Sequence, residues 1–248
     1  TIFNPGNSNE SIFEVNWDGN TYSQTGGPSA MYTTGTNPNY QYSTKMGEDL
    51  ENDYEEVIAG KDAVRSWYGA FIALTDGENT VHCIWKYKMG DTDPTNLDAI
   101  RLKDDANWII YRMADVMLMK AEALIWKGKE NWQEAVDIIN QIRTRANLLE
   151  KTIAIDEEDE SSMMENYLLP ERNIELAAEG KRWYDMIRYA KSKNYAHKSA
   201  FIALVQQYNT TANASWIRSV LQNEYAWYLP IHADEIENNT LLVQNPYY

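Results

Sequence analysis

Three glutamates stand four residues apart in the stretch PERNIELAAEGKRWYDMIRYAKS, with arginines between them. They are Glu171, Glu175 and Glu179. Glycoside hydrolysis uses two carboxylates that flank a scissile bond, about 5–9.5 Å apart. Residues four apart on a helix have Cβ atoms about 5–6 Å apart, so distance alone allows this chemistry. Direction argues against it, because carboxylates on one helical stripe point the same way, whereas catalytic carboxylates approach the sugar from different sides.

The arginines in the same stretch favour a structural role. Arg172, Arg182 and Arg188 carry planar guanidinium groups, which donate paired hydrogen bonds to buried or interfacial carboxylates. We therefore predict that the row is a Glu/Arg ladder that holds one helix against its neighbours, and not an active site. The side chains assigned to this structural set are Arg112, Glu122, Arg143, Glu171, Arg172, Glu175, Glu179, Arg182 and Asp185.

No other catalytic or metal-binding motif stands out. Cys83 is the single cysteine, and the three histidines are scattered, so no Cys/His cluster with metal-ligand spacing exists. Asp91, Asp93 and Asp98 have the spacing of part of a calcium loop, but the turn glycine and the final bidentate glutamate are missing. A solvated acidic loop is the preferred interpretation, and a calcium site stays open. We expect a protein that is not an enzyme and needs no cofactor.

The composition favours a neutral ligand. A net charge of −15 disfavours nucleic acid and anionic lipid headgroups as partners. The aromatic residues are 9 Trp and 17 Tyr against 4 Phe, and Trp and Tyr combine an apolar face with a polar group.

No apolar run reaches the roughly 18 residues that cross a bilayer. There is no signal peptide either, and the chain begins without Met, so we expect a fragment of a longer protein.

The elements that must position these residues fall into two regions. Residues 1–107 form a loop-rich, aromatic-rich region in which SIFEVNW and VHCIWKYK have the pattern of short strands and 53–74 could be partly helical. Residues 108–248 are dominated by helical patterns. We therefore predict a mainly α fold of tetratricopeptide-like helical hairpins, with long irregular loops and a few short strands.

One such hairpin is predicted over residues 111–146. Gly128 separates two amphipathic halves, and Asn131 with Glu134 has the pattern of a capping box that opens the second helix. Small residues at Ala123 and Ala135 should let the two helix axes approach closely. The expected apolar faces are Met113, Val116, Met117, Lys120, Ala121 and Leu124 in the first helix, and Ala135, Ile138, Ile139 and Ile142 in the second.

Four ordered motifs resemble the C-terminal half of the SusD/RagB family. They are IIYRMADVMLMKAEAL, EAVDIINQIRTRANL, LLPERNIELAAEGKRWYDMIRYAK and WYLPIHADEIENNTLLVQNPYY, and the early NESIFEVNW is also similar. The chain departs from the family pattern at scaffold positions, namely Asn173, Asp115, His232 and Thr240.

The resemblance implies a non-catalytic, surface-exposed lipoprotein of the Bacteroidetes outer membrane. Such proteins bind glycans and pass them to a TonB-dependent transporter of the SusC type. The lipid-bearing cysteine and most of the tetratricopeptide-like helices would belong to a half outside this chain, so the only expected link to the membrane is a lipid anchor that this chain lacks.

The ligand side is predicted from aromatic chemistry, since sugar rings stack on Trp and Tyr faces. The family motifs carry no binding residues onto this sequence. The candidates are Trp17, Tyr22, Tyr32, Tyr40 and Tyr42, with Trp67 and Tyr68 as second choices. Each of them could instead pack the loops onto the helices. Two other functions stay open: a tetratricopeptide-type module that binds peptides or proteins, and, less favoured, a glycan-active enzyme.

Overall fold

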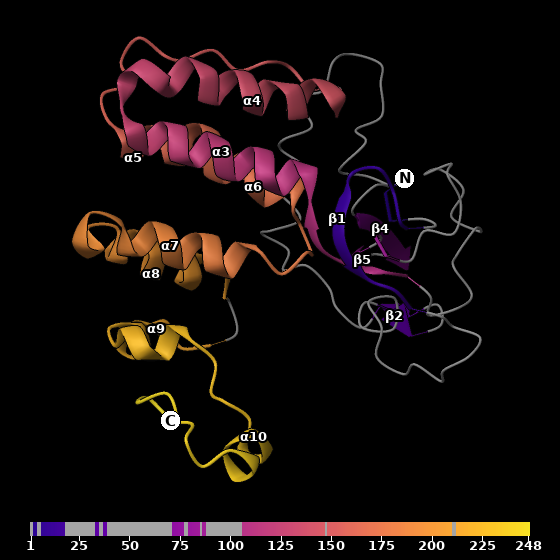
Figure 1. Cartoon of the computed structure of the whole chain (residues 1–248), viewed down its shortest axis with the longest axis vertical. Helices are drawn as coiled ribbons and strands as arrows, with labels where there is room; N and C mark the ends of the chain where they lie inside the picture. Colours follow the sequence, from indigo (N-terminus) through magenta and orange to yellow (C-terminus); the bar gives the residue numbers. More distant parts are fainter. Residues whose placement is uncertain are drawn as a thin grey trace. The chain divides into compact units, whose positions relative to one another are not determined.

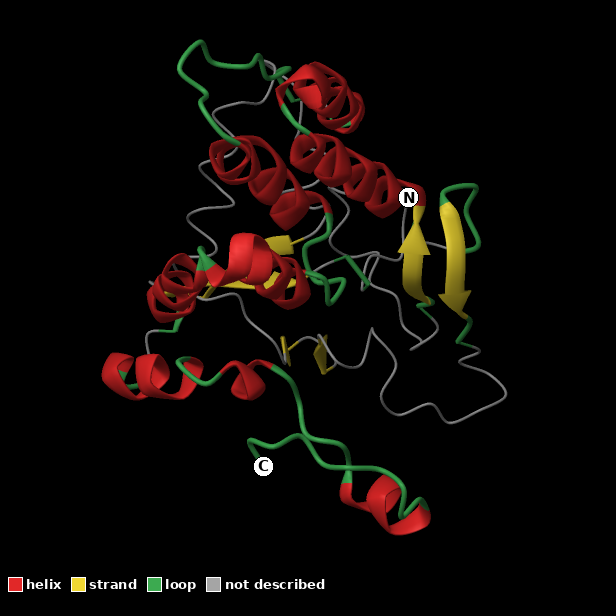
Figure 2. Cartoon of the chain, turned by 60° about the vertical axis from the view of Figure 1, so that its left-hand side comes forward, coloured by secondary structure: helices red, strands yellow, loops and turns green. Residues whose placement is uncertain are grey.

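Helices are the main regular structure in the computed structural model of the chain (Figures 1 and 2), as the sequence predicts. The predicted mainly α fold with a few short strands is therefore confirmed. The residues that the structure describes are 2–3, 6–17, 33–34, 37–38, 71–76, 79–84, 86–87, 106–146, 148–209 and 212–248.

The chain divides into two compact units, residues 1–182 and residues 183–248. The sequence predicted a different division, into a ligand side (residues 1–107) and a helical region (residues 108–248), and this stays a prediction. The strand β1 (Ser11–Val15), from the first of these regions, pairs antiparallel with β6 (Trp108–Arg112), from the second.

Two further strand pairs are short hairpins in the first unit. The strand β4 (Phe71–Asp76) pairs with β5 (Asn79–Ile84), and β2 (Thr33–Thr34) pairs with β3 (Asn37–Pro38), both antiparallel. Of residues 53–74, which were considered partly helical, the structure describes 71–74, and these belong to β4. The apolar run of β4 pairs residue by residue with β5, the next strand along the chain.

The helix α3 (Met113–Lys127) follows β6 without a loop, so it begins two residues later than predicted. Its inner face is also different: Ala114, Leu118, Ala121 and Ile125 are buried, whereas Met113 and Val116 are exposed. The helix has apolar residues almost all round, so the pattern fitted more than one face. The choice is made by tertiary contacts, since Asp115 and Glu122 are also buried on this face.

The helix α4 (Trp132–Arg145) completes the predicted hairpin and packs beside α3 (Figure 1). Its predicted face is confirmed, because Ala135, Ile138, Ile139 and Ile142 are all buried. The small residue opposite Ala135 was misplaced: Ala121 is fully buried, whereas Ala123 is exposed.

The predicted capping box at the start of α4 is wrong. A 3-10 turn, Lys129–Asn131, leads directly into the helix after Gly128, whose φ is 120°. The backbone of Asn131 is therefore already helical, and its side chain makes no capping hydrogen bond. Its amide instead donates to the Glu130 carboxylate at 3.1 Å.

The rest of the first unit runs through α5 (Glu160–Met163), a π-helical turn (Met164–Leu168) and α6 (Leu169–Glu175). After α6 the backbone turns, with a φ of 62° at Ala178 and 74° at Gly180. Glu179 thus lies beyond the helix. The three glutamates of the row do not share one helical stripe, because the helix ends before the third.

The second unit is built around aromatic packing. It holds α7 (Arg182–Tyr195), whose first residue closes the first unit and whose backbone is kinked at residues 192–194. It continues with α8 (Lys198–Tyr208), α9 (Ala214–Leu221), the 3-10 turn Glu224–Trp227 and α10 (Ala233–Asn238). The Trp227 ring lies edge-on to Phe201, with ring centroids 5.0 Å apart, and it is almost fully buried.

Candidate functional site

Trp17 is the one predicted ligand residue whose side chain the structure describes. It follows β1, and its backbone N–H donates to Asn107 Oδ1 at 3.0 Å. The Asn107 amide in turn donates to Glu14 and Asn16, at 2.7 and 3.0 Å, so one buried side chain ties the end of β1 to the start of β6. The Trp17 ring is half-buried, and its Nε1 is buried without a hydrogen-bond partner among the residues described.

The other predicted ligand residues lie outside the described part of the chain. They are Tyr22, Tyr32, Tyr40, Tyr42, Trp67 and Tyr68. The three aspartates of the possible calcium loop lie outside it as well. Among the described residues, no group of His, Cys, Asp or Glu side chains could hold a metal ion.

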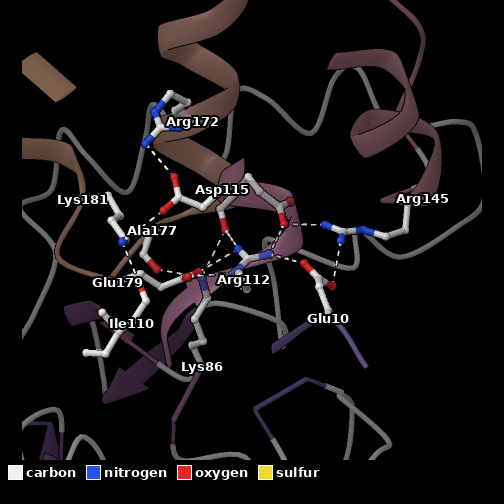
Figure 3. A network of polar contacts seen from close by, with 11 residues as sticks. Glu10, Lys86, Ile110, Arg112, Asp115, Arg145, Arg172, Ala177, Glu179 and Lys181 are labelled. Atoms are coloured by element: carbon white, nitrogen blue, oxygen red, sulfur yellow. Dashed lines mark hydrogen bonds and ion pairs between the residues drawn. The ribbon is translucent and has the colours of Figure 1, made fainter. Parts of the chain in front are cut away.

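Arg112 is the centre of a buried network of charges (Figure 3). Its Nε donates to Glu179 Oε2 and its Nη2 to Glu179 Oε1, each at 2.8 Å, so guanidinium and carboxylate meet as a two-pronged fork. Its Nη1 donates to Glu175 Oε1 at 2.6 Å and to Glu10 Oε1 at 2.7 Å. Arg112 is extended backbone at the join of β6 and α3, and this position sends its side chain to the end of α6.

Lys86 enters the same network from the residues after β5. Its ammonium donates to Glu179 Oε1 and to the Ala177 carbonyl, each at 2.7 Å, and to the Glu175 carbonyl at 3.3 Å. The side chain is buried, and the cluster of Phe3, Tyr87, Ala106 and Ile109 beside it is apolar.

Two more groups of charges extend the network along the helices. Asp115, on the buried face of α3, accepts from Arg172 at 2.9 Å and pairs with Lys181 at 3.0 Å. Arg145, at the end of α4, pairs with Glu175 and, at 3.1 Å, with Glu10. These pairs join β1, β6, α3, α4 and the segment after α6 (Figure 3).

Arg143 supplies a separate buried pair. Its Nη1 donates to Glu171 Oε2 at 3.1 Å and its Nε to the Leu149 carbonyl at 2.8 Å. Of the other residues predicted as structural, Glu122 is buried on α3, and Arg182 donates to the Leu169 carbonyl at 3.0 Å. In the second unit, Asp185 is buried and pairs with Arg188 at 2.9 Å.

Two buried cations determine the electrostatics of Glu179. Burial alone would raise the pKa of Glu179, but Lys86 and Arg112 outweigh it and hold that pKa below its ordinary value. Burial lowers the pKa of Lys86 despite the attraction of Glu179. The pKa of Arg112 is raised, because Glu179 and Glu175 outweigh the effect of its burial. A general acid needs a raised pKa near the working pH, so Glu179 is poorly suited to that role.

Several members of the network were not predicted. Lys86, Glu10, Arg145 and Lys181 were absent from the predicted structural set, and Asp115 was noted only as a scaffold position. Asp115 had a visible signal, since an acidic residue stands between Ala114 and Leu118 on an apolar helix face. Lys86 had none, because its segment has only the pattern of a short strand.

A polar cleft lies on the first unit beside α4. Its volume is about 520 Å³, within the range of small-molecule sites. Its lining residues are Asp137, Asn140, Gln141, Thr144 and Glu150. None of these is aromatic, so the cleft lacks the flat apolar surface on which a sugar ring stacks.

Within the described ranges, no helix is both long and apolar enough to cross a membrane.

Comparisons with known proteins all point to one family. The sequence model of the SusD family matches residues 72–248. SusD-like protein P38 of Formosa agariphila is 40% identical over 96 residues, covering 36% of this chain and 18% of that protein. SusD-like protein P2 of the same organism is 32% identical over 152 residues, covering 59% of this chain and 27% of that protein. The matched segments therefore span less than a third of the length of these relatives.

Solved structures share the fold. A SusD superfamily protein from Bacteroides thetaiotaomicron matches 95% of this chain and 44% of its own, with a TM-score of 0.60 and 20% identity. Surface glycan-binding protein A from Bacteroides uniformis matches 97% of this chain and 50% of its own, with a TM-score of 0.56 and 20% identity. The chain thus covers about half of each of these structures.

Proposed function

The chain belongs to the SusD family, and we propose that it binds a neutral glycan without cleaving it. The family match over residues 72–248 is the observation that carries this proposal. The name of a structural neighbour, surface glycan-binding protein A, agrees with it.

The charges and aromatic residues fit this role. A chain with a net charge of −15 repels anionic polymers but not an uncharged one. Trp and Tyr rings stack on the apolar faces of pyranose rings, while their polar groups and neighbouring side chains hold the hydroxyls. The buried carboxylates of the Arg112 network are engaged by cations, which supports a scaffold role for them and leaves recognition to other residues.

We place the ligand side in residues 1–107. The proposed contacts are Trp17, Tyr22, Tyr32, Tyr40 and Tyr42, with Trp67 and Tyr68 as second choices. Trp17 is half-buried at the end of β1, where Asn107 fixes its backbone. Only part of its ring surface is therefore accessible to a ligand.

The proposal extends to location and delivery. As a family member, the protein would act at the cell outer membrane, surface-exposed through a lipid anchor, and pass its glycan to a SusC-type TonB-dependent transporter. Co-purification of the protein with such a transporter from the same operon tests this part. The proposal is contradicted if the transporter is recovered without this protein, under conditions in which other SusD-family proteins stay bound to their transporters.

Glycan binding is tested by array screening followed by isothermal titration calorimetry. We expect at least one neutral polysaccharide to bind. Tyr22→Ala and Trp17→Ala should weaken that binding by about tenfold or more, because one stacked ring contributes on the order of 1–3 kcal/mol. Tyr184→Ala is the matched control, since Tyr184 is exposed in the second unit. Normal binding by both ligand-side variants refutes the proposed contacts, and cleavage of the glycan that Glu175→Gln abolishes refutes the non-catalytic role.

A peptide-binding module is the second candidate. It is favoured by the α3–α4 hairpin, whose outer face exposes Met113, Val116 and Met119. An array on which no glycan binds, with peptide binding that Val116→Asp abolishes, supports this candidate instead.

A further inference from the structure

The segment after α6 forms a socket for a cation. The carbonyls of Glu175 and Ala177 and the carboxylate of Glu179 all point to one ammonium group, at 2.7–3.3 Å. The carbonyl end of a helix attracts cations in general. The chain then turns at Ala178, whose φ of 62° is unusual for a residue with a side chain. The Ala177 carbonyl and the Glu179 carboxylate on either side of this residue accept from the same ammonium.

The occupant of the socket comes from a distant part of the chain. Lys86 lies 89–93 residues before its three acceptors, and it is separated from the end of β5 by a single residue. The three protons of its ammonium match the three acceptors, so its hydrogen bonds are directional and complete. Its neighbour Tyr87 packs on Phe3 and Trp108, with ring centroids 5.3 and 5.9 Å apart, which holds the same point by apolar contact.

Lys86 adds to a pair that is complete without it. Arg112 already binds both oxygens of Glu179. The wider cluster holds three cations (Lys86, Arg112, Arg145) and three carboxylates (Glu10, Glu175, Glu179), so Lys86 also balances its charge. Lys86 therefore adds a third point of attachment to a carboxylate that Arg112 already holds at both oxygens, and it reaches that carboxylate from the residues that follow the β4–β5 hairpin.

We propose that Lys86 is a positioning residue, whose ammonium locks the β4–β5 hairpin onto the end of α6 and thereby orients the ligand side of the chain. Only the second part of this inference, the orientation of the ligand side, rests on the proposed function. The hairpin begins three residues after Tyr68 in the sequence, so it adjoins one of the proposed contacts along the chain.

Hydrogen exchange of the full chain, followed by mass spectrometry, tests the lock. In Lys86→Met we expect the amides of β4 and β5 to exchange about tenfold faster or more, because a buried, charged hydrogen-bond set is lost. The amides of α3 and α4 should keep their protection. Unchanged exchange in the hairpin overturns the proposal.

Lys181→Met is the matched control. Lys181 belongs to the neighbouring charges, where it donates to the Ile110 carbonyl at 2.7 Å and pairs with Asp115, and neither of these partners belongs to β4 or β5. We expect this variant to leave exchange in β4 and β5 at the wild-type rate. Equal acceleration in both lysine variants shows a general loss of stability and overturns the lock.

Two further measurements keep the outcome decisive. If Lys86→Met does not fold, Lys86→Gln keeps two N–H donors and should speed exchange in the hairpin first; acceleration across the whole unit overturns the proposal. Titration with a glycan that the wild type binds should show about tenfold weaker binding by the folded Lys86 variant, and unchanged affinity beside a loosened hairpin refutes the orienting role. If the wild type binds no glycan, the proposed function fails, while the exchange data still decide the lock.

Discussion

The interiors of the two units differ in what they bury besides aliphatic side chains. The first unit buries charges, among them Arg112, Asp115, Glu175 and Glu179. The second unit buries aromatic rings around Trp227, and within its described residues Asp185 is the one buried charged side chain.

The difference lies in how strictly each interior depends on its partners. A buried charge is stable only while every partner is present, because an unpaired charge in a low-dielectric interior is strongly unfavourable. Aromatic packing is less directional, and its loss removes contact area in proportion to the atoms deleted. In the second unit, two indole N–H groups donate to backbone carbonyls, Trp227 to Leu221 at 2.9 Å and Trp183 to Trp227 at 2.8 Å. We therefore infer that the charged interior specifies one arrangement of strands and helices, and the aromatic interior mainly supplies apolar burial.

The largest effect is expected from Arg112→Met. This change leaves Glu175 and Glu179 buried with fewer cations, and it should lower the free energy of unfolding of the first unit by about 3–5 kcal/mol. Urea unfolding monitored by hydrogen exchange in α3 and α4 measures it. Arg218→Met is the matched control at an exposed position of the second unit and should change stability by less than about 0.5 kcal/mol. Equal effects of the two substitutions would refute the contrast.

A smaller loss is expected from Trp227→Leu. Leucine keeps part of the buried volume, but the edge contacts to Phe201 and Tyr195 and the hydrogen bond to Leu221 disappear. The free energy of unfolding of the second unit should fall by about 2–4 kcal/mol. Exchange of the α8 and α9 amides in urea reports the change. A loss above that of Arg112→Met would reverse the ranking of the two interiors.

Acid should act on the first unit before the second. The pKa of Glu179 in the folded chain lies below its ordinary value of 4.5, so the unfolded chain binds more protons there as the pH falls. The stability that Glu179 contributes is therefore complete above that value and is lost as the pH falls through the folded pKa. Urea midpoints of α3 and α8 amides, compared at neutral and acidic pH, test the order. A larger fall for α8 than for α3 contradicts it.

The smallest effect is expected from a surface pair of the first unit. Lys120 and Glu134 lie 2.8 Å apart, but both side chains are more than half exposed. Lys120→Met should therefore change the free energy of unfolding by less than about 1 kcal/mol. A loss comparable to that of Arg112→Met would show that burial is not what distinguishes the Arg112 network.

Local sequence signals predicted much of the fold. Gly128 and the regular apolar spacing of α4 predicted the α3–α4 hairpin, and the alternation in SIFEVNW predicted β1. At Gly180 the chain turns with a φ of 74°, which glycine adopts without strain. These features depend on residues close together in the sequence, which is why one sequence suffices for them.

Features that depend on distant partners were predicted poorly. The buried face of α3 is chosen by Asp115, whose partners Arg172 and Lys181 lie more than 50 residues away. Lys86 had no local signal because its three acceptors belong to the end of α6 and the segment after it. The glutamate row was expected on one helix, but α6 ends at Glu175, and Glu179 is placed by Arg112 and Lys86.

The central claim is that charged side chains build the platform and that flat rings in residues 17–68 hold an uncharged ligand. The most direct test is a crystal structure with the glycan that binds best on the array. The account predicts sugar rings stacked against Trp or Tyr side chains of that region. Sugar lying among Arg112, Glu175 and Glu179, away from any aromatic ring, would contradict it.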